Sequence, residues 1–154
     1  GVKIELIVRG ICVLIPGIPG ASDNITVRSI VGRFLEHSRI FWFRNGGREE
    51  LYISSADWMP RNLNDRVELM VPIEDPEIKR RLKQMVDIEL SDNQKAHIMQ
   101  ADGTWLKTIS AENQLCAQEY FQKIAEKRDA EDEMTLAQKL EPYTPVLGHG
   151  DGSD

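Results

Sequence analysis

The sequence predicts an α/β protein in which a mixed β-sheet is flanked by helices. Runs rich in β-branched and aromatic residues occur near the N-terminus and again around residue 40. Turn signals typical of hairpins, at residues 45–47 and 101–103, join pairs of strand-like segments. Two later stretches, beginning near residues 76 and 111, carry apolar residues at helical spacing.

The N-terminal segment is strand-like. Residues 2–14 read VKIELIVRGICVL and predict a strand. The chain begins directly on this run, so we expect a domain that belongs to a longer polypeptide. A loop with two Pro-Gly pairs follows at residues 16–20. Residues 22–24 either cap a short helix or lead into a second extended segment, and the sequence leaves both readings open.

A hairpin is predicted next. Residues 38–44 and 50–54 are strand candidates, and the Asn-Gly-Gly sequence at 45–47 supplies the turn between them. Residues 66–73 form a further β-rich run. A helix is then expected to start at Pro76, because proline at the first helical position removes no needed donor. Its expected apolar face is formed by Ile78, Leu82, Met85, Val86 and Ile88.

The remaining sequence predicts one more hairpin and one more helix. Residues 95–107 resemble a hairpin, and residues 111–127 are predicted to be helical. The core candidates on that helix are Leu115, Cys116, Phe121 and Ile124. From residue 128 the chain is polar, and we expect disorder from about residue 141, where proline, glycine and aspartate accumulate.

Charge is distributed unevenly along the chain. Residues 1–66 hold nine lysines or arginines against seven acidic residues, whereas residues 67–154 hold ten against eighteen. Eight of the eleven arginines lie in the first segment. Guanidinium groups match phosphate oxygens and stay charged when partly desolvated, so this cluster indicates a compact polyanion as ligand. A solvated surface is the alternative explanation, and a globally acidic chain does not favour nucleic acid.

Several other classes of protein do not fit the composition. The two cysteines, Cys12 and Cys116, fit reduced residues better than a disulfide framework or metal ligands. No apolar stretch reaches transmembrane length, and we expect a cytoplasmic location. The sequence has no glycine-rich phosphate loop and no Cys/His zinc spacing, so any phosphate would be bound by side chains.

Residues 35–66 place one histidine, His37, among arginines and aromatic residues. Phosphoryl transfer requires positive charge around the phosphate oxygens and often a titratable group beside the attacking or leaving oxygen. His37 is therefore a candidate catalytic residue, with a structural histidine bonded to backbone as the alternative. Arg9 lies within an apolar run and needs an anionic partner, either an acid such as Glu5 or Glu36 or a substrate.

Long sequence runs carry a resemblance to one family. They read LIVRGICVLIPGIPG, DNITVRSIVGRFLEHSRIF, YISSADWMPRNLNDRVE and LSDNQKA. The runs resemble the C-terminal catalytic domain of bacterial polyphosphate kinase of the first type, from Val2 to about Lys127. That family has an N-terminal domain, a head domain and two C-terminal domains with phospholipase-D-like folds. The resemblance implies the last of these domains at residues 1–127 and a polar extension at residues 128–154.

The activity implied by this resemblance is reversible transfer of the terminal phosphate of ATP to inorganic polyphosphate, through a phosphohistidine in the preceding domain. Matching the family pattern, Arg9 and His37 would line the active site and contact the nucleotide phosphates. Arg66 would be a further phosphate-contacting arginine, and Arg66 in a polar loop also fits a plain surface role. His37 would act as general acid or base, with electrostatic stabilisation as the alternative.

The resemblance also implies cofactors and partners. Mg²⁺ is the expected cofactor, with its ligands in the upstream domain and none in this chain. The expected partners are ATP or ADP, inorganic polyphosphate and the upstream domains of the same polypeptide, with no nucleic acid. The full-length enzyme would be a homo-oligomer, in the cytoplasm or associated with the membrane, whereas the isolated chain would be inactive and monomeric.

The phospholipase D signature offers a separate comparison. That superfamily has a histidine, one spacer and a lysine, whereas the chain reads His37-Ser38-Arg39. This departure argues against phosphodiester hydrolysis. A divergent phosphodiesterase and a non-catalytic ATP- or polyphosphate-binding module remain as alternatives. Further arginines are candidates for lining a polyphosphate channel: Arg28, Arg33, Arg39, Arg44, Arg48 and Arg61.

Overall fold

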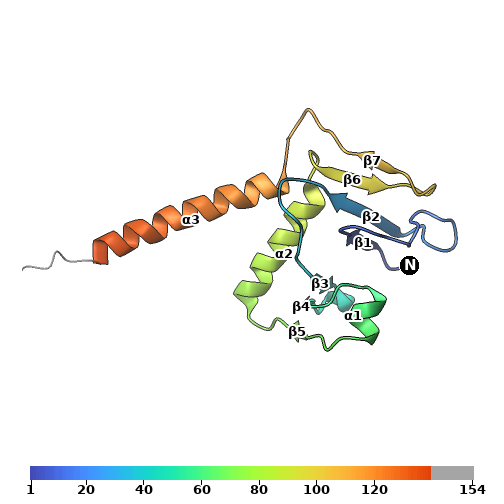
Figure 1. The fold of residues 1–154 in the computed structure, drawn as a ribbon, viewed down its shortest axis with the longest axis horizontal. Helices are drawn as coiled ribbons and strands as arrows, with labels where there is room; N and C mark the ends of the chain where they lie inside the picture. Colours follow the sequence, from blue (N-terminus) through green and yellow to red (C-terminus); the bar gives the residue numbers. More distant parts are fainter. Residues whose placement is uncertain (140–154) are drawn as a thin grey trace, which may run out of the picture. The chain divides into compact units, whose positions relative to one another are not determined.

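The computed structural model describes residues 1–139, with side chains described up to residue 130. The chain divides into one compact unit, Gly1–Tyr120, and a second unit that begins at Phe121. Both β-sheets and the first two helices belong to the first unit (Figure 1). The predicted α/β class is therefore confirmed, with the strands arranged in two sheets.

The first sheet has four strands and is mixed. Its order is β1 (Ile4–Ile7), β2 (Ile25–Ile30), β6 (Ala96–Met99) and β7 (Trp105–Lys107). β1 pairs with β2 in parallel, and the other two pairings are antiparallel. The two central strands provide much of the core, because strands with neighbours on both sides are covered most completely. The buried apolar residues of this sheet are Val27, Ile30, Ala96 and Met99.

The second sheet is antiparallel and contains the predicted hairpin. β3 (Ile40–Phe43) pairs with β4 (Glu50–Ser54), and β4 pairs with β5 (Met70–Pro72). The turn at Asn45–Gly47 places Gly46 at φ +63° and Gly47 at φ +96°, where a side chain is disfavoured. A short helix that the sequence did not predict, α1 (Pro60–Asn64), lies between β4 and β5.

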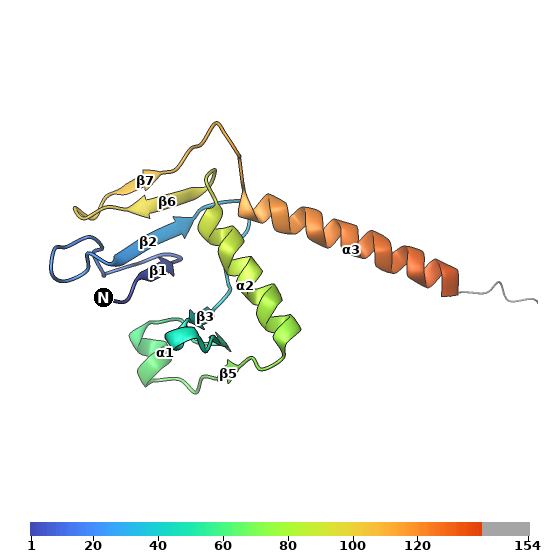
Figure 2. The same ribbon diagram turned by 180° about the vertical axis from the view of Figure 1, so that it is seen from behind.

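Two longer helices follow. α2 (Pro76–Ser91) leads from β5 in the second sheet to β6 in the first (Figures 1 and 2). The carboxylate of Asp75 caps its start by accepting from the backbone N–H groups of Glu77 and Ile78, both at 2.9 Å. α3 spans Ala117–Lys139. No helix within residues 1–139 is both long enough and apolar enough to cross a lipid bilayer.

Several predicted boundaries were wrong. The strand predicted at residues 2–14 ends at Ile7, because the chain turns at Gly10, which has φ +89°. The alternative of a helix after residues 22–24 is not realised, since β2 follows there. The helix predicted from residue 111 begins at Ala117 and continues beyond residue 127.

Two predicted core residues are also placed differently. Ile78 and Ile124 are exposed rather than buried. The disorder expected from about residue 141 concerns residues that lie outside the part of the chain described here.

Candidate active site

Three charged or titratable side chains, those of Arg9, His37 and Arg39, gather around Asp57. Arg9 follows β1, His37 and Arg39 precede β3, and Asp57 follows β4. Nε of Arg39 donates to Oδ1 of Asp57 at 2.9 Å, and Nη2 of Arg9 lies 3.9 Å from Oδ2 of the same carboxylate. Nη1 of Arg39 lies 3.1 Å from Nδ1 of His37. Asp57 thus links residues that come from both sheets.

Local chain geometry explains why these residues meet. The N–H of Ser54 donates to the carbonyl of Arg39 at 3.0 Å, which continues the β3–β4 pairing to the residues just outside it. Asp57 lies three residues after Ser54, at the end of the second sheet where β3 begins. His37 and Arg39 are separated by one residue in an extended segment, so their side chains lie on the same side.

Arg39 and Arg9 are held to different degrees. Arg39 also donates to the carbonyl of His37 at 3.3 Å, and its side chain is 18% exposed. The side chain of Arg9 is 34% exposed, and its 3.9 Å contact with Asp57 is too long for a hydrogen bond. Arg39 is therefore fixed by the protein, whereas the guanidinium of Arg9 retains donors for an external anion.

The electrostatics of the cluster keep Asp57 ionised. The hydrogen bond from Arg39 lowers the pKa of the Asp57 carboxyl, partial burial opposes this, and the charges of Arg39 and Arg9 lower it further. The guanidinium groups of Arg9 and Arg39 both face this one carboxylate. The excess positive charge makes the cluster suitable for binding phosphate.

The contact with Arg39 also selects one state of the His37 ring. A guanidinium group only donates hydrogen bonds, so Nδ1 of His37 must accept. A neutral ring then carries its proton on Nε2. Because His37 is exposed, this N–H group can donate to an oxygen of a bound phosphate.

A second carboxylate, Glu68, lies near Arg66 and Arg39. It accepts from the Asn62 amide at 2.7 Å and from the hydroxyl of Ser55. These two hydrogen bonds lower the pKa of the Glu68 carboxyl most, and the charges of Arg66 and Arg39 lower it further. Arg66 is exposed and forms no ion pair with any residue in the described part of the chain.

The structure brings together two of the three residues proposed from the sequence. Arg9 and His37 share the Asp57 cluster, whereas Arg66 acts on its neighbour Glu68. The sequence left open whether Arg9 would face an acid, such as Glu5 or Glu36, or a substrate; the acid that it faces in the structure is Asp57. Glu5 instead lies 3.3 Å from the Lys3 ammonium, and Glu36 accepts from a glutamine amide at 2.6 Å.

Sequence reasoning missed the roles of Asp57 and Arg39. Arg39 is only one of several candidate channel arginines in the sequence analysis, and Asp57 is not a predicted site residue. The signal was present in the histidine-spacer-arginine pattern, because alternate residues of an extended segment share one side. What the pattern lacked was the identity of the carboxylate on the facing loop.

The described residues do not offer a metal site. Between residues 1 and 130, no group of three or more His, Cys, Asp or Glu side chains is arranged to hold an ion. Asp57 already faces two guanidinium groups, so its oxygens do not suit Mg²⁺, which prefers carboxylates free to coordinate it.

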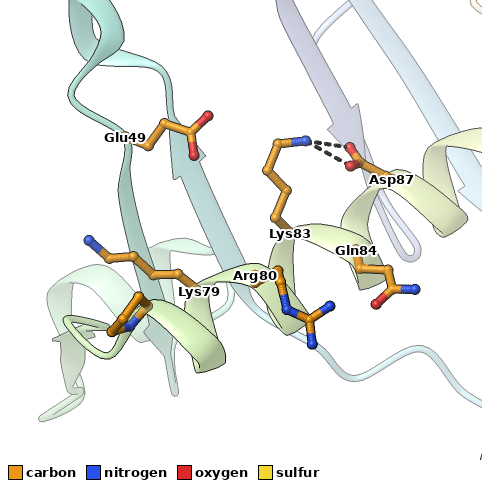
Figure 3. A pocket seen from close by; sticks show the side chains of 7 residues that line it. Glu49, Lys79, Arg80, Lys83, Gln84 and Asp87 are labelled. Atoms are coloured by element: carbon orange, nitrogen blue, oxygen red, sulfur yellow. Dashed lines mark hydrogen bonds and ion pairs between the residues drawn. The ribbon is translucent and has the colours of Figure 1, made fainter.

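A pocket of about 610 Å³ lies along α2 (Figure 3). Its basic side chains are largely satisfied by the protein: Nζ of Lys83 lies 2.7 Å from Asp87, and Nη2 of Arg80 lies 2.5 Å from Glu77. Lys83 also lies 4.9 Å from the centre of the Trp42 ring. The lining contains none of the site residues proposed from the sequence; it is formed by Glu49, Pro76, Lys79, Arg80, Lys83, Gln84 and Asp87.

Comparison with known proteins finds one matching family and several similar proteins. The family described as "Polyphosphate kinase C-terminal domain 2" matches residues 1–118. The chain is 55% identical over 114 residues to a polyphosphate kinase of Pseudomonas aeruginosa, covering 74% of this chain and 16% of that protein. It is 53% identical over 130 residues to a polyphosphate kinase of Synechocystis, covering 82% of this chain and 18% of that protein.

A solved structure agrees with these matches. The crystal structure of polyphosphate kinase from Porphyromonas gingivalis superposes with a TM-score of 0.78 at 41% sequence identity. The match covers 84% of this chain and 20% of that one. The chain therefore spans between about one sixth and one fifth of the length of these relatives.

Proposed function

Because the chain belongs to the polyphosphate kinase family, of which it represents C-terminal domain 2, we propose that it forms part of an active site for phosphoryl transfer. The reaction is reversible transfer of the terminal phosphate of ATP to inorganic polyphosphate. The observation that supports this most directly is the cluster in which Arg9, His37 and Arg39 surround Asp57. Such a cluster combines positive charge with a donor that is held in place.

The proposed reaction uses a histidine of the upstream domain as nucleophile. Its ring nitrogen bonds to the terminal phosphorus of ATP while the bond from that phosphorus to the bridging oxygen breaks, and ADP leaves. An oxygen at the end of a polyphosphate chain then takes the phosphoryl group from the phosphohistidine. The reverse sequence makes ATP from ADP.

Each residue of the cluster has a separate task in this scheme. Arg9 binds phosphate oxygens, since its contact with Asp57 is loose. Nε2–H of His37 donates to the oxygen that leaves with ADP, as general acid or as a stabilising donor. Arg39 and Asp57 hold His37 in place. Arg66 adds positive charge from the neighbouring loop.

The wider setting is proposed with the reaction. Mg²⁺ would neutralise phosphate charge, held by ligands of the upstream domain. The working enzyme would be a cytoplasmic or membrane-associated homo-oligomer in which the upstream domains of the same polypeptide complete the site.

The proposal is tested on the complete enzyme that contains this chain. We expect His37→Ala to abolish nearly all ATP-driven synthesis and ADP-driven consumption of polyphosphate, at matched folded content. His97→Ala is the control: His97 lies in β6, where its ring contacts the carbonyl of Lys95, and it should retain activity.

Three other outcomes would count against the proposal. Unchanged rates in His37→Ala would refute the catalytic role of this histidine and leave it with a structural one, although the enzyme would still transfer phosphate. An inactive wild type that binds ATP or polyphosphate would indicate a binding module. Hydrolysis of a phosphodiester by the wild type would indicate a phosphodiesterase instead.

A further inference from the structure

The segment that carries His37 has almost no backbone support. Val31 donates from its N–H to the carbonyl of Lys95, and the carbonyl of Arg39 accepts from Ser54. Between these two anchors, residues 32–38 form no backbone–backbone hydrogen bond with any other residue in the range 1–139. The position of His37 must therefore depend on side chains that hold this segment from outside.

One side chain supplies three hydrogen bonds to the segment. Nε2 of Gln118 donates to the carbonyl of Phe34 at 2.8 Å and to the carboxylate of Glu36 at 2.6 Å. Oε1 of Gln118 accepts from the N–H of Phe34 at 3.0 Å. Both amide protons and one acceptor site are used, and Gln118 is only 7% exposed. Glu36 is the residue immediately before His37.

The backbone that carries Gln118 is itself fixed. The N–H of Ala117 donates to Oδ2 of Asp92 at 2.8 Å, and Asp92 is 3% exposed. The other oxygen of Asp92 accepts from three successive N–H groups at the start of β6, those of Gln94, Lys95 and Ala96. The two oxygens of Asp92 therefore connect the start of α3 to the segment that leads into β6 of the first sheet.

Gly32 allows the Gln118 amide to approach. A Cβ at position 32 would lie 2.7 Å from Cδ of Gln118 and would overlap its side-chain oxygen. The backbone of Gly32 does not have a positive φ, so an alanine would be unfavourable there only because of this contact. The Gln118 amide can therefore take this position only because residue 32 has no side chain.

We propose that Gln118 is a positioning residue for His37, which it places by holding the backbone of Phe34 and the side chain of Glu36. This inference rests on the proposed function, because it assumes that His37 acts on phosphate. Gln118 touches no reacting atom in this arrangement. Its loss should misplace the ring of His37, and displacements on the order of 1 Å can cost about a hundredfold in rate.

The test uses the complete enzyme and two variants. Gln118→Ala should lower kcat roughly tenfold to a hundredfold, with the KM for ATP changed less than about twofold, since uniform binding is unaffected. Gln118→Glu keeps the size of the side chain but places a carboxylate against the Phe34 carbonyl and Glu36, so it should be at least as impaired. Gln122→Ala is the control, because that amide contacts Glu126 on the exposed face of the same helix.

A double-mutant cycle separates positioning from general damage. Gly32→Ala should lower kcat because it displaces the Gln118 amide, yet it should have little further effect in a chain that already carries Gln118→Ala. Hydrogen exchange provides a readout that does not depend on activity. The peptide containing residues 32–38 should exchange faster in Gln118→Ala than in wild type, since the N–H of Phe34 loses its acceptor.

The outcomes distinguish the two proposals. Normal kcat in Gln118→Ala, or losses from Gly32→Ala and Gln118→Ala that multiply, would overturn the positioning role while leaving the proposed function intact. Unaltered exchange of residues 32–38 would overturn it equally. If His37→Ala is fully active, the catalytic role proposed for His37 fails, and its positioning by Gln118 fails with it even where exchange increases.

Discussion

Glu89 should make the stability of the fold depend on pH near neutrality. It is a carboxylic acid on α2 that is only 7% exposed. Burial raises the pKa of Glu89 to about 7, and the negative charge of Glu36 contributes in the same direction. The folded chain therefore binds the proton of Glu89 more tightly than the unfolded chain does.

The size of the effect follows from the two pKa values. A rise from 4.5 to about 7 corresponds to about 3 kcal/mol at about 1.4 kcal/mol for each pKa unit. This stability is fully present below pH 4.5 and is lost as the pH rises through about 7. Most of this loss, roughly 2 to 3 kcal/mol, falls between pH 5 and pH 9.

Glu89→Gln removes the titration while keeping the size of the side chain. Relative to wild type, we expect the free energy of unfolding of the variant, measured in urea, to increase by roughly 2 to 3 kcal/mol between pH 5 and pH 9. Glu77→Gln is the control, because the hydrogen bond from Arg80 lowers the pKa of Glu77, so the titration of Glu77 changes stability in the opposite direction to that of Glu89. The reasoning would be refuted if the free energies of unfolding of Glu89→Gln and wild type differed by the same amount at pH 5 and at pH 9.

Three further predictions concern the site, the fold and the isolated chain. In the complete enzyme, Asp57→Asn should lower the rate of polyphosphate synthesis at least about tenfold because it weakens the hold on Arg39, and an unchanged rate relative to the exposed control Asp87→Asn would contradict this. Asp92→Ala should lower the free energy of unfolding by about 3 kcal/mol or more, since four backbone N–H groups lose their acceptor. Urea unfolding measures this loss, and a smaller value would contradict the prediction. The purified 154-residue chain should show no polyphosphate synthesis from ATP, and sustained turnover by it would contradict the need for an upstream histidine.

Local signals in the sequence predicted elements that depend on few residues. The hairpin at β3 and β4 was located by its Asn-Gly-Gly turn, and β4 has the predicted bounds. The start of α2 was located by Pro76, because the capping residue and the proline lie next to each other in the chain. The family, too, could be identified from continuous runs of residues, and comparison confirms it.

Prediction was poorer where long-range packing decides the outcome. The apolar run at residues 11–15 resembles a strand, yet it follows the turn at Gly10 and pairs with no strand in the described part of the chain. α1 went unpredicted because a helix of one turn has too few residues to show a period.

The sequence by itself determined the α/β class, the main helices and strands, the family, and the choice of Arg9 and His37 as candidates. Only the tertiary structure decided that Asp57 joins Arg9 to Arg39 and that Gln118 holds the segment before His37. The physical reason is distance along the chain. Residues 18 or more positions apart meet only after the strands have paired, and no local propensity specifies which carboxylate or amide will face a given arginine or loop.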